Sequence, residues 1–233
     1  MTYYAGTSGF AHPHWVGSFY DDTSVQSSSI LSVYAKSIPF VELEQTFYRW
    51  PRPEVIEKWA AQTDKSFRIT FAGLRRITHE KRLRDVEPLV QYFLNLVAPL
   101  EKRAGPVVYQ LPAFFRKDVD RLEKFLAAHQ GKIRVCMAFK HPSWFSNDVY
   151  AVLKNHNAAL CFSDSPDAQQ ELVQTANWNY ARLNKIDGDN DASLDAAVTL
   201  VKNMAPKGDM FVVVPPSVAG PTTAQRLQER LRA

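Results

Sequence analysis

The chain contains only two cysteines among its 233 residues. Cys136 and Cys161 both lie within apolar runs, and neither belongs to a spacing that is typical of metal ligands. A disulfide framework and a cysteine-based zinc site are therefore not expected. We predict two reduced thiols that pack in the core.

Long apolar runs are also missing. No run approaches the roughly 18 residues that a membrane span requires. The N-terminus lacks the order of a signal peptide, in which a basic stretch precedes an apolar one. We therefore expect a soluble cytoplasmic protein with no membrane partner.

Fingerprints of nucleotide cofactors and of activated serines are absent as well. The segment Gly6-Thr7-Ser8-Gly9 departs from both the dinucleotide pattern and the P-loop pattern, so it predicts a tight turn after the first strand. No Gly-x-Ser-x-Gly elbow occurs. These absences argue against a nucleotide cofactor, and the sequence identifies no other cofactor.

Possible metal ligands are scattered along the chain. His14, His79 and His141 each follow a strand-like run, as do Asp164 and Asp187. None of them belongs to a His-x-x-x-His or Glu-x-x-His spacing, so we predict no metal site and interpret each histidine as a loop residue that hydrogen-bonds the backbone. Ligands from separate strands could still meet around a divalent cation, because spacing does not test such a site.

Neither sign of charge dominates, with 28 Lys and Arg against 24 Asp and Glu. The formal net charge is only +4, which is consistent with anionic partners but is too small to establish nucleic-acid binding, because that function usually shows a denser basic face.

Eight short runs rich in β-branched and aromatic residues indicate strands. They cover residues 3–6, 40–44, 67–72, 107–111, 134–139, 159–163, 180–183 and 210–214. Apolar residues at three-to-four spacing predict helices between them, over 30–37, 53–62, 86–102, 117–129, 147–156, 194–204 and 222–232. The connection before Tyr180 shows the weakest helical pattern. Eight alternating units without a linker predict one domain over residues 1–233, an α/β fold of the TIM-like (β/α)8 barrel class.

Strand parity predicts which side chains enter the barrel. Alternate residues of a strand face the barrel axis, and the others must be apolar to meet the surrounding helices. On this basis Glu42 and Glu44 point inward, with Arg68, Lys140 and Arg182 as candidate partners. We predict a buried ion network.

Aromatic and polar clusters follow three of the strands, at residues 10–20, 45–50 and 141–145. In a parallel barrel the carboxyl ends of the strands converge on one face, so these clusters are expected to surround one pocket. Trp15, Tyr48 and Trp144 would form its walls, or they would plug the top of the barrel.

The densest basic stretch, residues 75–84, follows the third strand and should overhang the same mouth. Arg75, Arg76 and Lys81 are candidates for contact with a phosphate group or, alternatively, with a nucleic-acid backbone. Ordinary solvated charge on a helix face remains the other interpretation.

We predict a small anionic or phosphate-bearing ligand at the mouth. The full set of predicted ligand-binding residues comprises His14, Trp15, Glu42, Tyr48, Arg75, Arg76, Lys81, Lys140, Trp144, Asp164 and Arg182. An alternative is a hydrolase or lyase in which Glu44 is the general base and His79 or His141 is the proton donor. Both carboxylates could instead be purely structural.

Ten short motifs occur in order along the chain. They are Gly6-Thr7-Ser8-Gly9-Phe10, His14-Trp15, Phe19-Tyr20, Val41-Glu42-Leu43, Thr46-Phe47-Tyr48-Arg49, Ile77-Thr78-His79, Arg82-Leu83, Gln110-Leu111-Pro112, His141-Pro142-Ser143-Trp144-Phe145 and Asp164-Ser165. Together they closely resemble the YecE-like family, domain of unknown function 72. The resemblance runs through most of the chain and implies a TIM-like barrel. It implies no particular reaction.

The sequence departs from the pattern that this resemblance implies. The family pattern leads us to expect Asn at Glu44, Lys at Ala72, Glu at Ala138, Arg at Lys140 and His at Asn184. It also leads us to expect Asn-Asn where Pro215-Pro216 follows the last strand. Parity places the first five positions inside the barrel, so the resemblance implies a divergent member whose chemistry is altered or lost.

Overall fold

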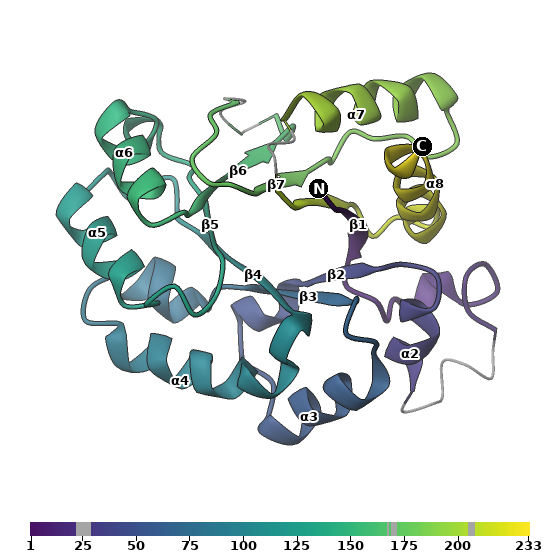
Figure 1. The fold of residues 1–233 in the computed structure, drawn as a ribbon, viewed down its shortest axis with the longest axis horizontal. Helices are drawn as coiled ribbons and strands as arrows, with labels where there is room; N and C mark the ends of the chain where they lie inside the picture. Colours follow the sequence, from purple (N-terminus) through teal and green to yellow (C-terminus); the bar gives the residue numbers. More distant parts are fainter. Residues whose placement is uncertain (22–28, 167, 169–171, 205–207) are drawn as a thin grey trace.

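Eight parallel strands close into a barrel in which each strand pairs with its neighbour in the chain and β8 pairs with β1 (Figure 1). The computed structural model describes residues 1–21, 29–166, 168, 172–204 and 208–233. The strands are β1 (Tyr3–Ser8), β2 (Phe40–Leu43), β3 (Arg68–Ala72), β4 (Ala104–Gln110), β5 (Val135–Ala138), β6 (Ala159–Ser163), β7 (Asn179–Arg182) and β8 (Met210–Val214). The predicted (β/α)8 barrel is confirmed.

Helices surround the strands (Figure 1). They are α2 (Ile30–Ala35), α3 (Pro53–Gln62), α4 (Glu87–Val97), α5 (Val119–Ala127), α6 (Asn147–Asn155), α7 (Asp191–Met204) and α8 (Gly220–Arg232). Within the described part of the β6–β7 connection there is no helix, which is the connection whose sequence pattern was weakest. None of the helices in the described ranges has the length and apolar character to cross a membrane.

The two faces of each strand follow the predicted parity. Val41, Ile69 and Met137 face outward and belong to the large core between strands and helices. Inward residues such as Phe40 and Cys136 belong to a second cluster on the barrel axis. The barrel therefore has two cores that are separated by its own wall.

Aromatic rings fill the lower part of the interior, toward the amino ends of the strands. Phe211 stacks on Tyr4 at 5.0 Å between ring centroids and meets Phe40 at 5.4 Å and Trp178 at 6.0 Å. Close aromatic packing of this kind excludes water, so side chains fill the interior toward the amino ends of the strands.

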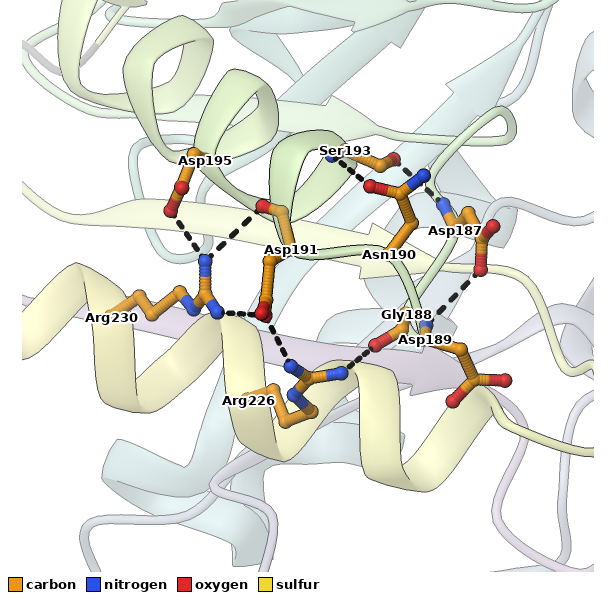
Figure 2. Close-up of polar contacts among 9 residues, drawn as sticks. All are labelled: Asp187, Gly188, Asp189, Asn190, Asp191, Ser193, Asp195, Arg226 and Arg230. Atoms are coloured by element: carbon orange, nitrogen blue, oxygen red, sulfur yellow. Dashed lines mark hydrogen bonds and ion pairs between the residues drawn. The ribbon is translucent and has the colours of Figure 1, made fainter.

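The loop after β7 is tied to α7 and α8 by ion pairs and hydrogen bonds (Figure 2). Asp187 Oδ1 accepts a hydrogen bond from the Asp189 amide at 3.1 Å. The Asp191 carboxylate binds Arg226 at 2.6 Å and also binds Arg230, both on α8. Asp187 and Asp191 therefore bind other groups of the protein. Among the described residues, no group of three His, Cys, Asp or Glu residues could hold a metal ion.

Gly188 in this loop lies against α8. A methyl group added there would lie 1.8 Å from Thr223 Oγ1 and 3.0 Å from Thr223 Cα, so the helix would have to move. We expect Gly188→Ala to lower the free energy of unfolding by about 1–3 kcal/mol, measured by urea denaturation. Asp189→Ala, at an exposed neighbouring position, should change it by less than about 0.5 kcal/mol. Equal effects of the two substitutions would contradict the packing argument.

Candidate functional site

A buried ion pair crosses the barrel interior. The Glu42 side chain is fully buried, and both its oxygens accept from Arg182, through Nη2 and, at 3.2 Å, through Nε. Tyr180 Oη donates a third hydrogen bond to Glu42 at 2.6 Å. Burial, and then the nearby Glu42 charge, raises the pKa of Tyr180 well above its ordinary value, so its hydroxyl stays a donor. The predicted pairing of Glu42 with Arg182 is present.

Glu42 and Gln110 both bind the Arg182 guanidinium. Its Nη1 donates to Gln110 Oε1 at 3.2 Å. A guanidinium carries five N–H groups, and three of them bind Glu42 or Gln110. The remaining two bind no residue in the described ranges.

Two cavities lie above this pair, at the carboxyl ends of the strands. Their volumes are about 180 and about 230 Å³, and both are lined by Glu44, Gln110 and Arg182. Lys140 and Asn184 line the first cavity. Other residues complete the lining of each cavity. We call the two cavities together the mouth site. The remaining lining of the first cavity is Ala138, Phe139, Phe145, Cys161, Ser163, Ser165 and Ala168, and that of the second is Phe47, Tyr48, Ala72 and Val108.

The predicted buried network is smaller than parity suggested. Strand β2 ends at Leu43, and Glu44 begins a short 3-10 helix, η2 (Glu44–Phe47), with an exposed side chain. Thr46 fixes this turn, because its hydroxyl lies 2.6 Å from Leu43 O and 2.8 Å from Ala72 O. The prediction that Glu44 is buried was wrong, because the strand ended one residue before it.

Arg68 is also absent from the network. Its Nη1 donates to the backbone carbonyls of Lys65 at 2.8 Å and Phe67 at 3.0 Å, at the opposite end of the barrel. Strand parity correctly predicted that the Arg68 side chain points toward the barrel axis, but it did not predict where along that axis the side chain lies. A first residue of a strand lies at the amino end, far from the mouth.

The three predicted histidines occupy different surroundings. His79 Nδ1 lies 2.9 Å from Thr78 Oγ1, and its ring meets Phe47 of the mouth site at 5.1 Å. Burial, then the positive charges of Arg75 and Lys140, lowers the pKa of His79. A histidine that is neutral near pH 7 is a poor proton donor there, which weakens its predicted role as the acid.

His141 and His14 bind backbone groups, as the loop interpretation expected. His141 Nδ1 accepts from the Ser143 amide at 3.1 Å and so caps a short turn. His14 Nε2 lies 2.7 Å from Pro216 O on the exposed surface. Neither residue lines the mouth site.

Two of the three aromatic residues that were predicted to form the walls are buried away from the mouth site. Trp15 Nε1 donates to Ser217 O at 2.8 Å, and Trp144 Nε1 donates to Phe115 O at 2.7 Å. Both side chains are fully buried in the core between strands and helices and line neither cavity, so the prediction that they contact a ligand was wrong, and they do not plug the barrel axis either. Tyr48 is 76% exposed and lines the second cavity.

The basic loop is strained but lies outside the two cavities. A π-helical turn covers Arg76–Glu80, and Arg82, Leu83 and Asp85 have positive φ angles. Such backbone is uncommon and concentrates at functional sites.

The cations of this loop differ in exposure. Arg75 is exposed and pairs with Glu80 at 2.7 Å, Arg76 is exposed, and Lys81 is half-buried. Their role in binding phosphate or nucleic acid stays a prediction.

Asp164 acts on the backbone. Its Oδ1 accepts from the Asn184 amide at 2.5 Å, and its Oδ2 accepts from the Lys185 amide at 3.2 Å. It therefore positions Asn184 at the rim of the first cavity without lining that cavity itself.

Sequence reasoning missed several residues of the mouth site. Gln110, Ser163 and Cys161 line the first cavity, and extending the parity argument to β4 and β6 would have placed them inside. Both thiols are free. Cys136 is buried as expected, whereas Cys161 is only half-buried.

A family model described as "Protein of unknown function DUF72" matches residues 4–233. The chain belongs to this family. The UPF0759 protein YecE of Escherichia coli K12 is 33% identical over 144 residues, which are 61% of this chain and 50% of that protein. The UPF0759 protein YunF of Bacillus subtilis 168 is 24% identical over 132 residues, 53% of this chain and 47% of that protein. These matches span about half the length of the curated relatives.

Solved DUF72 structures share the fold. One from Enterococcus faecalis V583 has a TM-score of 0.79 at 18% identity and covers 100% of this chain and 96% of its own. Another from Thermotoga maritima MSB8 has a TM-score of 0.78 at 20% identity and covers 100% of both chains.

Five positions at which the resemblance led us to expect other residues line the mouth site. They are Glu44, Ala72, Ala138, Lys140 and Asn184. Pro215 and Pro216, the other expected departure, line neither cavity. That the family has other residues at these positions stays a prediction.

Proposed function

We propose that the mouth site binds a small molecule that carries a carboxylate or phosphate group. The observation that carries this proposal is the fixed Arg182 guanidinium, which Glu42 and Gln110 hold in place while two of its N–H groups bind no described residue. A donor that is already oriented loses little freedom on binding an anion. Lys140 lies in the same cavity and adds a positive charge.

Charge balance limits what the site can recognise. Glu42 offsets the charge of Arg182, and Glu44 lines the same cavity as Lys140, so long-range attraction contributes little. Specificity must then come from directional hydrogen bonds, which Asn184 and Arg182 can donate. Glu44 can accept from a hydroxyl or amine at the other end of the ligand, so a small anion that also carries a donor fits best.

Ligand binding can be tested by thermal shift and calorimetry with a panel of hydroxycarboxylates and phosphate monoesters. A ligand at 100 times its Kd should stabilise the fold by about 2.7 kcal/mol. We expect Lys140→Gln to weaken that ligand about tenfold, because a charge-assisted hydrogen bond is lost. Lys58→Gln, at an exposed position of α3 outside both cavities, should leave the affinity unchanged. A flat response of the wild-type chain to the whole panel would overturn the proposal.

A hydrolase or lyase is the second candidate, and the position of Glu44 favours it. This carboxylate lines both cavities, and no residue in the described ranges donates a hydrogen bond to it. It can therefore accept a proton from a bound molecule. Once a ligand is known, Glu44→Gln should reduce its turnover by about 100-fold or more while the ligand still binds. Full turnover by this variant would remove Glu44 as the base.

A further inference from the structure

We propose a second anion-binding site at the opposite end of the barrel, for a small molecule with a pyrophosphate group. A cavity of about 400 Å³ opens there, between the amino ends of β3 and β4 and the residues that precede β5 and β8. It is larger than either cavity of the mouth site. We call it the floor site.

Arg68 is the first of two arginines that define the floor site. Its guanidinium carbon lies 5.1 Å from the centroid of the Tyr4 ring, so the group rests on the aromatic filling of the barrel. Nη1 donates to two backbone carbonyls. No carboxylate within the described ranges pairs with Arg68, so its half-buried charge has no anionic partner there.

Arg134 is the second, and the same aromatic filling supports it. Its guanidinium carbon lies 5.7 Å from the ring centroids of both Trp178 and Phe211. Asp209 binds its Nη1 at 2.7 Å, which fixes the group without using the rest of its N–H donors. Phe211 stacks on Tyr4, so the two arginines lie on one continuous aromatic surface.

The cavity has an excess of positive charge. Four cationic side chains line it, from Arg68, Lys102, Lys132 and Arg134, against two carboxylates, from Glu101 and Asp209. Both carboxylates already have partners, because Glu101 lies 3.8 Å from Lys65 and Asp209 binds Arg134. The uncompensated charge therefore favours an anion.

The helix dipole does not explain why Arg68 and Arg134 lie at the floor site. Cations are common where helices end, because the helix dipole is negative there. This accounts for Lys102, in the last turn of the short helix Ala98–Arg103, and for Lys132, which follows α5. Arg68 and Arg134 belong to or adjoin strands instead, and their charged groups lie over rings near the barrel axis.

The two guanidinium groups point to a ligand with paired anionic groups. A planar guanidinium donates two parallel hydrogen bonds to one phosphate, so two arginines match two linked phosphoryl groups. The volume exceeds what one tetrahedral ion fills. An apolar ligand would remove water from both charged groups without replacing their hydrogen bonds, which is unfavourable.

Calorimetry of the full chain with inorganic pyrophosphate tests the floor site, with orthophosphate at equal ionic strength for comparison. We expect one pyrophosphate per chain, bound more tightly than orthophosphate. Arg68→Met and Arg134→Met should each weaken pyrophosphate about tenfold or more, because each removes charge-assisted hydrogen bonds. Methionine keeps an unbranched apolar chain over the rings, and Lys132→Gln, at an exposed position, serves if either variant fails to fold.

The matched control is Lys58→Gln, which removes an exposed cation from α3 outside both sites and should leave pyrophosphate affinity unchanged. Lys140→Gln tests instead whether pyrophosphate binds at the mouth site. The proposal is overturned if the wild type does not bind pyrophosphate at low salt, or if Lys140→Gln weakens it while the floor variants do not. Competition between pyrophosphate and single-stranded or duplex nucleic acid that depends on Arg68 would assign the face to a phosphodiester backbone, which also overturns the small-molecule proposal. The floor site does not depend on the mouth site, so each can fail alone.

Discussion

Replacing Arg182 with methionine is expected to lower the free energy of unfolding by about 3–5 kcal/mol, because it leaves the Glu42 carboxylate buried with only the Tyr180 hydroxyl as a donor. Glu42→Met should cost a similar amount, since it leaves the guanidinium without its anion. Urea unfolding of the purified variants measures both. The reason is that a carboxylate inside the barrel has lost its hydration and depends on its partner.

The double variant Glu42→Met with Arg182→Met separates an unpaired charge from simple loss of packing. Removing both ions at once avoids a buried unpaired charge, so the double variant should be more stable than the sum of the two single losses predicts, by about 3 kcal/mol. Gln110→Met removes a neutral partner of the same arginine and should cost only about 1 kcal/mol. Additive single losses would contradict the buried ion pair.

Acid is expected to destabilise the protein through His129. This side chain is 1% exposed, lies 2.9 Å from Phe125 O through Nδ1 and lies 3.0 Å from Tyr109 Oη through Nε2. Burial lowers the pKa of His129 to about 4, and the hydrogen bonds to backbone groups only partly oppose this. In the unfolded chain His129 has an ordinary histidine pKa near 6.5. Below that pH, His129 therefore binds a proton in the unfolded chain that it does not bind in the folded protein.

The stability that His129 contributes is therefore fully present above about pH 6.5, and it is lost as the pH falls toward 4. The loss should reach about 3 kcal/mol at pH 4, from the difference between the two pKa values. Carboxylates also titrate in this range, so the measurement is the difference between wild type and His129→Gln in urea unfolding at pH 7, 6, 5 and 4. The variant should be less stable at pH 7 but should lose less on acidification. Parallel pH curves would show that His129 is not held neutral.

The barrel itself could be predicted from local patterns. Alternation in β2, with Val41 outward and Glu42 inward, follows from steric alternation along any strand, and the requirement that helices cover the outer face decides which residues are apolar. The same rule placed Arg182 inside. It failed at Glu44, because parity assumes that the strand continues, and β2 ends at Leu43.

Aromatic residues at strand ends could not be assigned from sequence. A tryptophan that packs under a helix and one that binds a ligand can follow a strand at the same spacing, and only burial separates Trp15 and Trp144 from the exposed Tyr48. The floor site was missed for a related reason. Inward parity says that Arg68 and Arg134 face the axis, but not that they rest on Tyr4, Trp178 and Phe211, which come from other strands.

The sequence therefore predicted the order of the strands, their two faces and the resemblance to DUF72 proteins, because each depends on residues near one another in sequence. The depth of each charged side chain, its partners and the two cavities depend on strands that close around a common axis. Glu42 and Arg182 are 140 residues apart in sequence and bind each other directly. Such a contact exists only after β1 has paired with β8, and it is the closure of the barrel that determines which charges are buried, which are paired and which remain available to a ligand.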